Sequence, residues 1–122
     1  VPALELADAL IAAMAHFDHR LPERFGGHTR EPGDVPTPYP TACRPQAWAA
    51  GVPLQLAAMC LGLEPDVPNG RLQLNPILSP RLAQLEVSGI AFPTGALSVR
   101  VDRAARVRII QAPHDLVIEL RE

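Results

Sequence analysis

The sequence predicts an α+β fold: two helices joined by a long loop rich in proline and glycine, followed by a small antiparallel β-sheet. In the first half, apolar residues recur every three or four positions, as on one face of a helix. From Glu64 onward they alternate with polar residues, which is the period of a half-buried strand. We therefore expect a helical part over residues 1–63 and a β-rich appendage over residues 64–122.

The first helix is expected over residues 3–19, because its apolar positions fall on one side of a helix. These positions are Leu4, Ala7, Leu10, Ile11, Met14 and Phe17. Proline fits the first helical turn, so Pro2 is compatible with a start here.

Residues 21–44 are expected to form a loop, because repeated prolines fix φ and remove backbone donors. Connections of this length are uncommon in compact domains and are often functional. Frequent proline also makes such a loop stiff, which suits the wall of a binding site.

A second helix is expected over residues 45–63, with Pro45 in its first turn, a kink at Pro53 and Gly62 near its C-terminal cap. This helix is apolar on nearly every side, and such a helix must be enclosed by protein. A chain of 122 residues that begins with Val1 offers too little material to enclose it. We therefore expect the chain to be one piece of a longer protein.

The second half shows alternating runs that predict strands separated by turn-forming residues. Short connections favour an antiparallel meander. The alternating apolar residues are Leu72 and Leu74; Leu85 and Val87; Leu97, Val99 and Val101; Val107 and Ile109; and Leu116, Ile118 and Leu120.

Composition excludes several classes of partner and site. A net charge of −2 without a basic cluster does not indicate nucleic-acid binding. The longest apolar stretch, residues 47–63, is short and interrupted for a membrane span, and no secretory signal is recognisable. Cys43, Cys60 and the four histidines lack metal-binding spacing, so we expect no metal, no cofactor and a reducing cytoplasmic location. Cys60 is expected to be a small core residue.

Glu23 is the candidate catalytic residue, because it lies in the loop between Pro22 and Phe25, close to Gly26 and Gly27. Glycine lets a ligand approach the backbone closely, and a partly desolvated carboxylate can act as a general base. The alternative is an ordinary solvated glutamate.

Arg44, Gln46 and Trp48 are candidate ligand-binding residues at the start of the second helix. Free N–H groups and the helix dipole favour polar ligands there, although Gln46 can equally be a capping residue. An indole stacks on the flat apolar face of a sugar, but a tryptophan is also a common core residue.

Two blocks of sequence resemble the C-terminal end of bacterial amylo-α-1,6-glucosidases, the glycogen-debranching family. The first is Phe17-x-x-Arg20-Leu21-Pro22-Glu23-x-Phe25-x-Gly27. The second is Tyr39-Pro40-x-Ala42-Cys43-x-Pro45-Gln46-Ala47-Trp48-Ala49-Ala50-Gly51. The resemblance continues through Cys60-Leu61-Gly62-Leu63 and Leu72-x-Leu74-x-Pro76.

This resemblance implies that the helices are the last pair of an (α/α)6 toroid that cleaves α-glucosidic linkages with inversion. Glu23 would be the general base, and Trp48 and Phe25 would form part of a glucose subsite. The family usually has leucine where this chain has Arg24. The general acid would lie upstream, so the chain alone would be inactive. The implied partners are an oligosaccharide and the rest of the catalytic domain.

Two other interpretations of the sequence stay open. The chain can be a stand-alone interaction module that docks its apolar second helix onto a partner or onto a second copy. It can also belong to a pseudo-enzyme of the same family.

Overall fold

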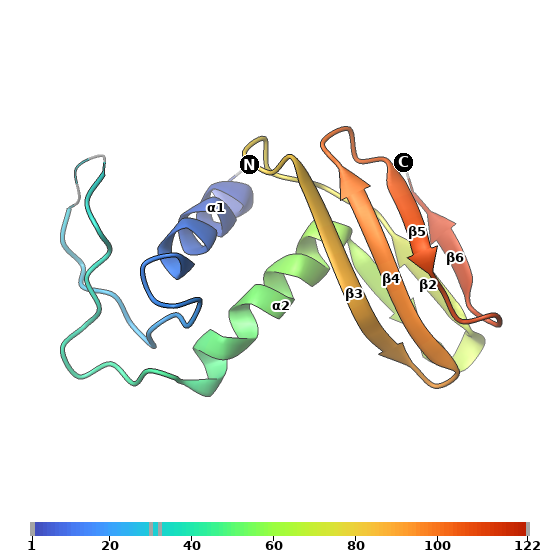
Figure 1. Cartoon of the computed structure of the whole chain (residues 1–122), viewed down its shortest axis with the longest axis horizontal. Coiled ribbons are helices and arrows are strands. Elements are labelled where there is room, and N and C mark those ends of the chain that lie inside the picture. Colours follow the sequence, from blue (N-terminus) through green and yellow to red (C-terminus); the bar gives the residue numbers. More distant parts are fainter. Residues whose placement is uncertain (1, 30, 32, 122) are drawn as a thin grey trace. The chain divides into compact units, whose positions relative to one another are not determined.

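The computed structural model describes residues 2–29, 31 and 33–121, which form an α+β fold. The helices are α1 (Pro2–Met14) and α2 (Ala47–Leu61), and six strands follow them (Figure 1). Contacts divide the chain into two compact units, Val1–Gln55 and Leu56–Glu122, and the division falls inside α2. The boundary expected between residues 63 and 64 lies inside the second unit, within the first strand, β1 (Leu63–Asp66).

The helix α1 ends at Met14, so the prediction that it continues to residue 19 is wrong. Asp18 and His19 both have positive φ, at 51° and 60°, which ends an α-helix, and the His19 N–H returns to the Met14 carbonyl at 3.0 Å. The predicted buried face is nevertheless confirmed. Ala7 and Phe17 are buried, and the other predicted face positions are half-buried.

Both ends of α2 agree with the sequence to within two residues. At its C-terminal end Gly62 has φ of +54°, and a Cβ at this position would collide with the backbone of Asn75. A glycine is therefore required both by the left-handed conformation and by the close approach. Cys60 and Leu61 are buried, as expected for Cys60.

The described residues do not enclose α2 on every side, as expected for a chain with too little protein to surround this helix. Trp48 is 84% exposed and Leu54 is 75% exposed, whereas Ala49 is buried. The reason is the small amount of protein around this half of the helix. In the first unit Ala49 forms a core with Ala13 and Leu21, and this core covers only one side of α2.

The second unit contains two three-stranded sheets. In the first, β1 pairs antiparallel with β2 (Arg71–Leu74), and β2 pairs in parallel with β6 (Val117–Leu120). The prediction of an all-antiparallel meander is therefore wrong for this sheet. The physical reason is the path of the chain, which builds the whole second sheet between β2 and β6 and then returns beside β2 in the same direction.

The second sheet is the predicted antiparallel meander, in the order β3-β4-β5. Its strands are β3 (Gln84–Phe92), β4 (Gly95–Asp102) and β5 (Val107–Gln111). The residue pairs Val87–Val99 and Leu85–Val101 face each other across β3 and β4. Figure 1 shows the three strands side by side.

The two sheets share one hydrophobic core, which also takes in the end of α2. The alternation in the sequence predicts five of its six buried members. The members are Leu61, Leu72, Leu74, Leu97, Val99 and Val101, each 0% or 1% exposed. These leucines and valines bury their whole side chains, so this core is the main source of stability for the second unit. Among the described residues, no helix is long and apolar enough to cross a bilayer.

Candidate functional site

Glu23 and Cys43 face each other across the loop through two reciprocal hydrogen bonds. The Glu23 N–H donates to the Cys43 carbonyl oxygen at 3.1 Å, and the Cys43 N–H donates to the Glu23 carboxylate atom Oε2 at 3.3 Å. The carboxylate is thus held by a backbone donor from a segment 20 residues away. A charged acceptor makes such a hydrogen bond stronger than a neutral pair would.

The pairing continues beyond these two residues and makes an irregular antiparallel ribbon. The Tyr39 N–H donates to the Arg24 carbonyl at 3.0 Å, and the Gly26 N–H donates to the Thr37 carbonyl at 2.8 Å. Phe25 and Pro38 form a β-bridge between these bonds. Repeated prolines remove donors from this segment, so the ribbon does not extend into a regular sheet.

Arg24 supplies the positive charge closest to Glu23. Its Nε lies 3.9 Å from the carboxylate atom Oε1, and its Cζ lies 5.1 Å from the centroid of the Tyr39 ring. The Glu23 side chain is 34% exposed and that of Arg24 is 57% exposed, so water screens the ion pair. The result is a partly exposed carboxylate whose Oε2 accepts a backbone N–H and whose Oε1 faces the Arg24 guanidinium.

Arg44 joins the end of the loop to the turn after α1. Its Nη2 lies 3.3 Å from the Asp18 carboxylate, and its Cζ lies 5.8 Å from the centroid of the Phe17 ring. Phe17 in turn meets Phe25 edge-on, with ring centroids 5.7 Å apart. The Arg44 guanidinium is therefore engaged by the protein itself, and these contacts hold the two ends of the loop together.

Gln46 caps α2, which is the alternative to a ligand-binding role that the sequence offered for this residue. Its Oε1 accepts the N–H of Ala49 at 3.1 Å, which satisfies one of the free donors of the first helical turn. Trp48, two residues further on, is 84% exposed, so its interpretation as a core residue is wrong. The indole is free to meet a ligand or another protein segment.

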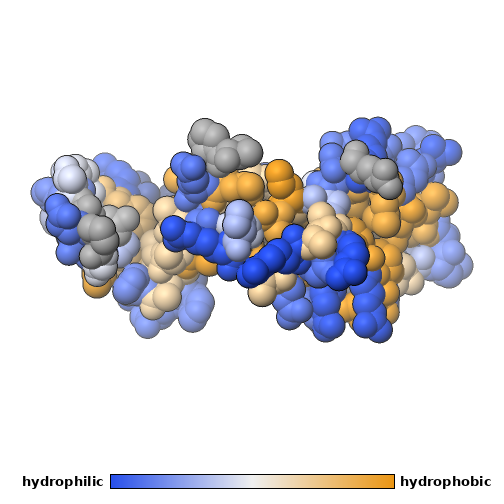
Figure 2. Space-filling view, turned by 90° about the horizontal axis from the view of Figure 1, so that it is seen from above, coloured by the Kyte–Doolittle hydropathy of each residue, from blue (hydrophilic) through white to orange (hydrophobic). Residues whose placement is uncertain are grey.

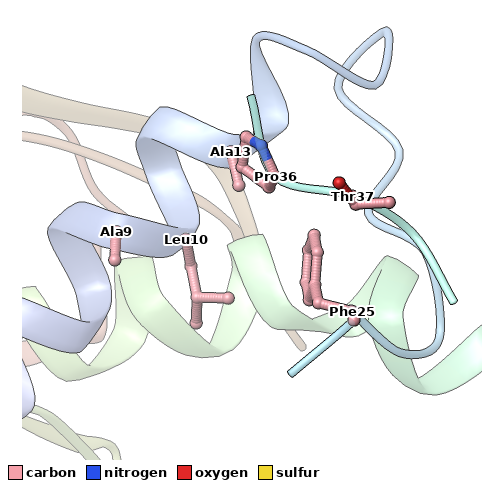
Figure 3. A pocket seen from close by; sticks show the side chains of 7 residues that line it. Ala9, Leu10, Ala13, Phe25, Pro36 and Thr37 are labelled. Carbon is pink, nitrogen blue, oxygen red and sulfur yellow. The ribbon is translucent and has the colours of Figure 1, made fainter. Parts of the chain in front are cut away.

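The first unit has a largely apolar cavity of about 240 Å³ beside α1. Figure 3 shows Leu10 of α1 and Phe25 of the loop directed toward the same space, with Thr37 at its edge. Its lining residues are Ala9, Leu10, Ala13, Phe25, Gly26, Pro36 and Thr37. Of the predicted site residues Phe25 lines this cavity, whereas Glu23, Arg44, Gln46 and Trp48 do not.

The structure thus unites Glu23, Phe25 and Arg44 in the loop and leaves Gln46 as a cap and Trp48 on the helix surface. The partners that sequence reasoning missed are Tyr39 under Arg24 and the backbone of Cys43. Tyr39 is visible as the single tyrosine of the chain, but nothing in the sequence indicates its register with Arg24.

Comparisons with known proteins add no relative. No protein-family model, no curated protein and no solved structure matches this chain. Among the residues that the structure describes, no group of three or more His, Cys, Asp or Glu side chains is placed to hold a metal ion.

Proposed function

We propose that the chain is the C-terminal part of an inverting glycoside hydrolase that cleaves α-glucosidic linkages of glycogen-type or maltooligosaccharide substrates. Glu23 is its general base in this proposal. One observation carries it. The two sequence blocks that resemble debranching α-glucosidases lie against each other in the fold, and the bonds that join them hold the Glu23 carboxylate.

The chemistry of inversion fits the arrangement around Glu23. An inverting enzyme needs one carboxylate that takes a proton from water and one carboxylic acid that protonates the leaving oxygen, about 6.5–9.5 Å apart. The Cys43 N–H holds Oε2 of Glu23, and Oε1, which lies 3.9 Å from Arg24 Nε, is the proton acceptor in this proposal. The acid belongs to an upstream segment in this proposal, so the 122-residue chain alone is expected to be inactive.

Aromatic residues near the loop support a sugar as the ligand. The Trp48 indole presents a large apolar surface, and Phe25 lines the cavity beside the loop. Sugar rings have apolar faces that pack on such side chains. Gln46 and Arg44 contribute chiefly by holding the helix start and the loop, because both side chains are already hydrogen-bonded within the protein.

The test is the substitution Glu23→Gln in the longer protein, assayed on maltooligosaccharides with NMR detection of the released anomer. Loss of a general base reduces kcat by about 10²–10⁴-fold. The amide oxygen introduced by this substitution can still accept the Cys43 N–H, so folding should be unaffected. Glu31→Gln is a matched control, because Glu31 is an exposed carboxylate of the same loop. Full activity of the Glu23→Gln enzyme, or a retained anomeric configuration, would remove the assignment.

A second candidate function is a stand-alone interaction module without catalysis. Exposed apolar side chains on the helices favour it, namely Leu6 at 62%, Trp48 at 84% and Leu54 at 75%. Figure 2 shows hydrophobic residues at the surface among hydrophilic ones. Size-exclusion chromatography of the chain distinguishes the interaction module from the glycoside hydrolase fragment. A stable monomer favours the stand-alone module, and association of the chain favours a piece of a larger domain.

A further inference from the structure

The strand β5 is an open edge of its sheet. The strand order is β3-β4-β5, so among the strands of the described residues β5 pairs with β4 alone, and its other side is unpaired. Every second residue of such a strand directs its N–H and C=O away from the sheet. An unpaired edge of this kind is a template for one more strand.

The side chains of β5 leave this edge accessible. Val107 is half-buried against the core, and each of the four residues that follow is exposed. Ile109 is 38% exposed and Ile110 is 48% exposed. Since neighbouring residues of a strand point to opposite faces, the edge presents apolar surface on both faces of the sheet.

A row of charges on the outer face ends abruptly at this edge. Glu86 of β3 faces Arg100 of β4, which in turn faces Arg108 of β5. The Arg100 guanidinium is bound by Glu86 at 2.6 Å. Arg108 makes no ion pair with any residue that the structure describes, and its neighbour across the ladder has the same charge. Like charges in facing positions repel, so an acid on the open side would complete the row.

The same charges speak against a second copy of this chain at the edge. Two β5 strands paired with each other would gather Arg100 and Arg108 of both copies on one face, with only the two Glu86 carboxylates to balance them. Repulsion of this kind is how natural edge strands avoid self-pairing. The complementary occupant is a strand that brings a negative charge.

A groove extends the surface beyond the start of β5. It has a volume of about 550 Å³, and its lining includes Val107, Leu120, Arg106 and Arg121. It combines apolar walls with the exposed guanidinium groups of Arg121 and Arg106, the second of which is paired with the Asp102 carboxylate at 2.7 Å. A partner chain that continues past the start of β5 would therefore meet further apolar and basic side chains.

We infer that β5 binds an extended segment of a partner protein as an added strand, with an acidic residue opposite Arg108 and an apolar residue opposite Ile110. Backbone hydrogen bonds to the open edge supply affinity, and the alternating side chains supply selectivity. The site lies in the second unit and does not depend on Glu23 or on any glycoside hydrolysis.

The experiment uses the 122-residue chain and the capped peptide Ser-Thr-Ile-Val-Glu-Val-Ser. We expect saturable binding by fluorescence anisotropy, with amide chemical-shift changes concentrated in β5. Exchanging Glu for Lys in the peptide, or raising the salt concentration, should weaken binding. Arg108→Glu should weaken binding of the acidic peptide by about tenfold and strengthen binding of the lysine peptide.

Two controls separate strand addition from general attraction. Arg103→Glu makes the same charge change in the turn before β5 and should alter the affinity less than about twofold, since an exposed charge off the ladder contributes little. A peptide with N-methylated Val residues cannot pair with the edge and should not bind. The inference is overturned if Arg108→Glu leaves the affinity unchanged, if N-methylation has no effect, or if the shifts lie outside β5.

Discussion

Glu23 and Cys43 hold each other across the loop through two hydrogen bonds, and both bonds use the backbone of Cys43. The Cys43 thiol takes no part in either bond. The orientation of the carboxylate therefore depends on the N–H at position 43 and not on the side chain there. This distinction is testable, because one substitution can remove the donor and another can leave it in place.

We predict that Cys43→Pro disturbs the candidate site. Proline has no N–H, so Oε2 of Glu23 loses its backbone donor. A hydrogen bond to a charged acceptor contributes about 1.5–3 kcal/mol when shielded, and the partial exposure of Glu23 reduces this to about 1 kcal/mol. Urea unfolding of the chain measures this loss, and kcat of the longer protein should fall with KM less affected.

Cys43→Ala is the matched control for this prediction. It keeps both backbone groups, so the free energy of unfolding should stay within about 0.5 kcal/mol of that of the original protein, as for a surface substitution. The activity of the longer protein should be unchanged. If the alanine variant loses as much as the proline variant, the Cys43 side chain and not its N–H is what the loop requires.

Much of the fold could be predicted from the sequence, because burial imposes periodicity. The helix face from Leu4 to Met14 and the alternation through Leu97, Val99 and Val101 both match the structure. The end of α1 could not be foreseen, since Asp18 and His19 adopt positive φ without a glycine to indicate it. The strand β1 was missed because its four residues include Pro65 and show no alternation.

Pairing between segments that lie far apart in the sequence could not be predicted either. The parallel pairing of β2 with β6 depends on the path of the chain through another sheet, which local patterns do not encode. In the candidate site, the sequence singles out Glu23 but not its partner, because a backbone donor has no sequence signature. The interpretation of Trp48 as a core residue rests on the average burial of tryptophan, and its 84% exposure reflects how little of the first unit surrounds α2.

Asp102 should make the stability of the second unit depend on pH. Its carboxylate accepts the N–H groups of Ala104 and Arg106 at 2.9 and 3.0 Å and the Arg106 Nε at 2.7 Å. The side-chain hydrogen bond from Arg106 lowers the pKa of Asp102 below its ordinary value of 3.8. A lowered carboxyl pKa means that the stabilisation is complete above the unfolded value and disappears as the pH falls through the folded one.

The measurement is the Tm of the protein and of Asp102→Asn across the acid range. At pH 7 the variant should melt at a lower temperature, because a neutral amide cannot form the ion pair with Arg106. The difference should shrink below about pH 4, where the original carboxylate becomes protonated. Glu64→Gln changes an exposed carboxylate on an edge strand and provides the comparison. A Tm difference between Asp102→Asn and the original protein that stays constant from pH 7 to pH 2 would contradict the role of Asp102.

The two glycines of α2 and its cap should respond in opposite directions to alanine. Gly62→Ala forces a Cβ into the backbone of Asn75 and places alanine at φ of +54°, so we expect destabilisation of about 2–4 kcal/mol. Gly51→Ala adds a methyl group inside the helix, where nothing lies within 4 Å of it, and should stabilise the protein by about 0.5–1 kcal/mol. Chemical denaturation of both variants measures these changes. Equal effects would mean that the left-handed conformation of Gly62 and its close approach to Asn75 do not require glycine at the end of α2.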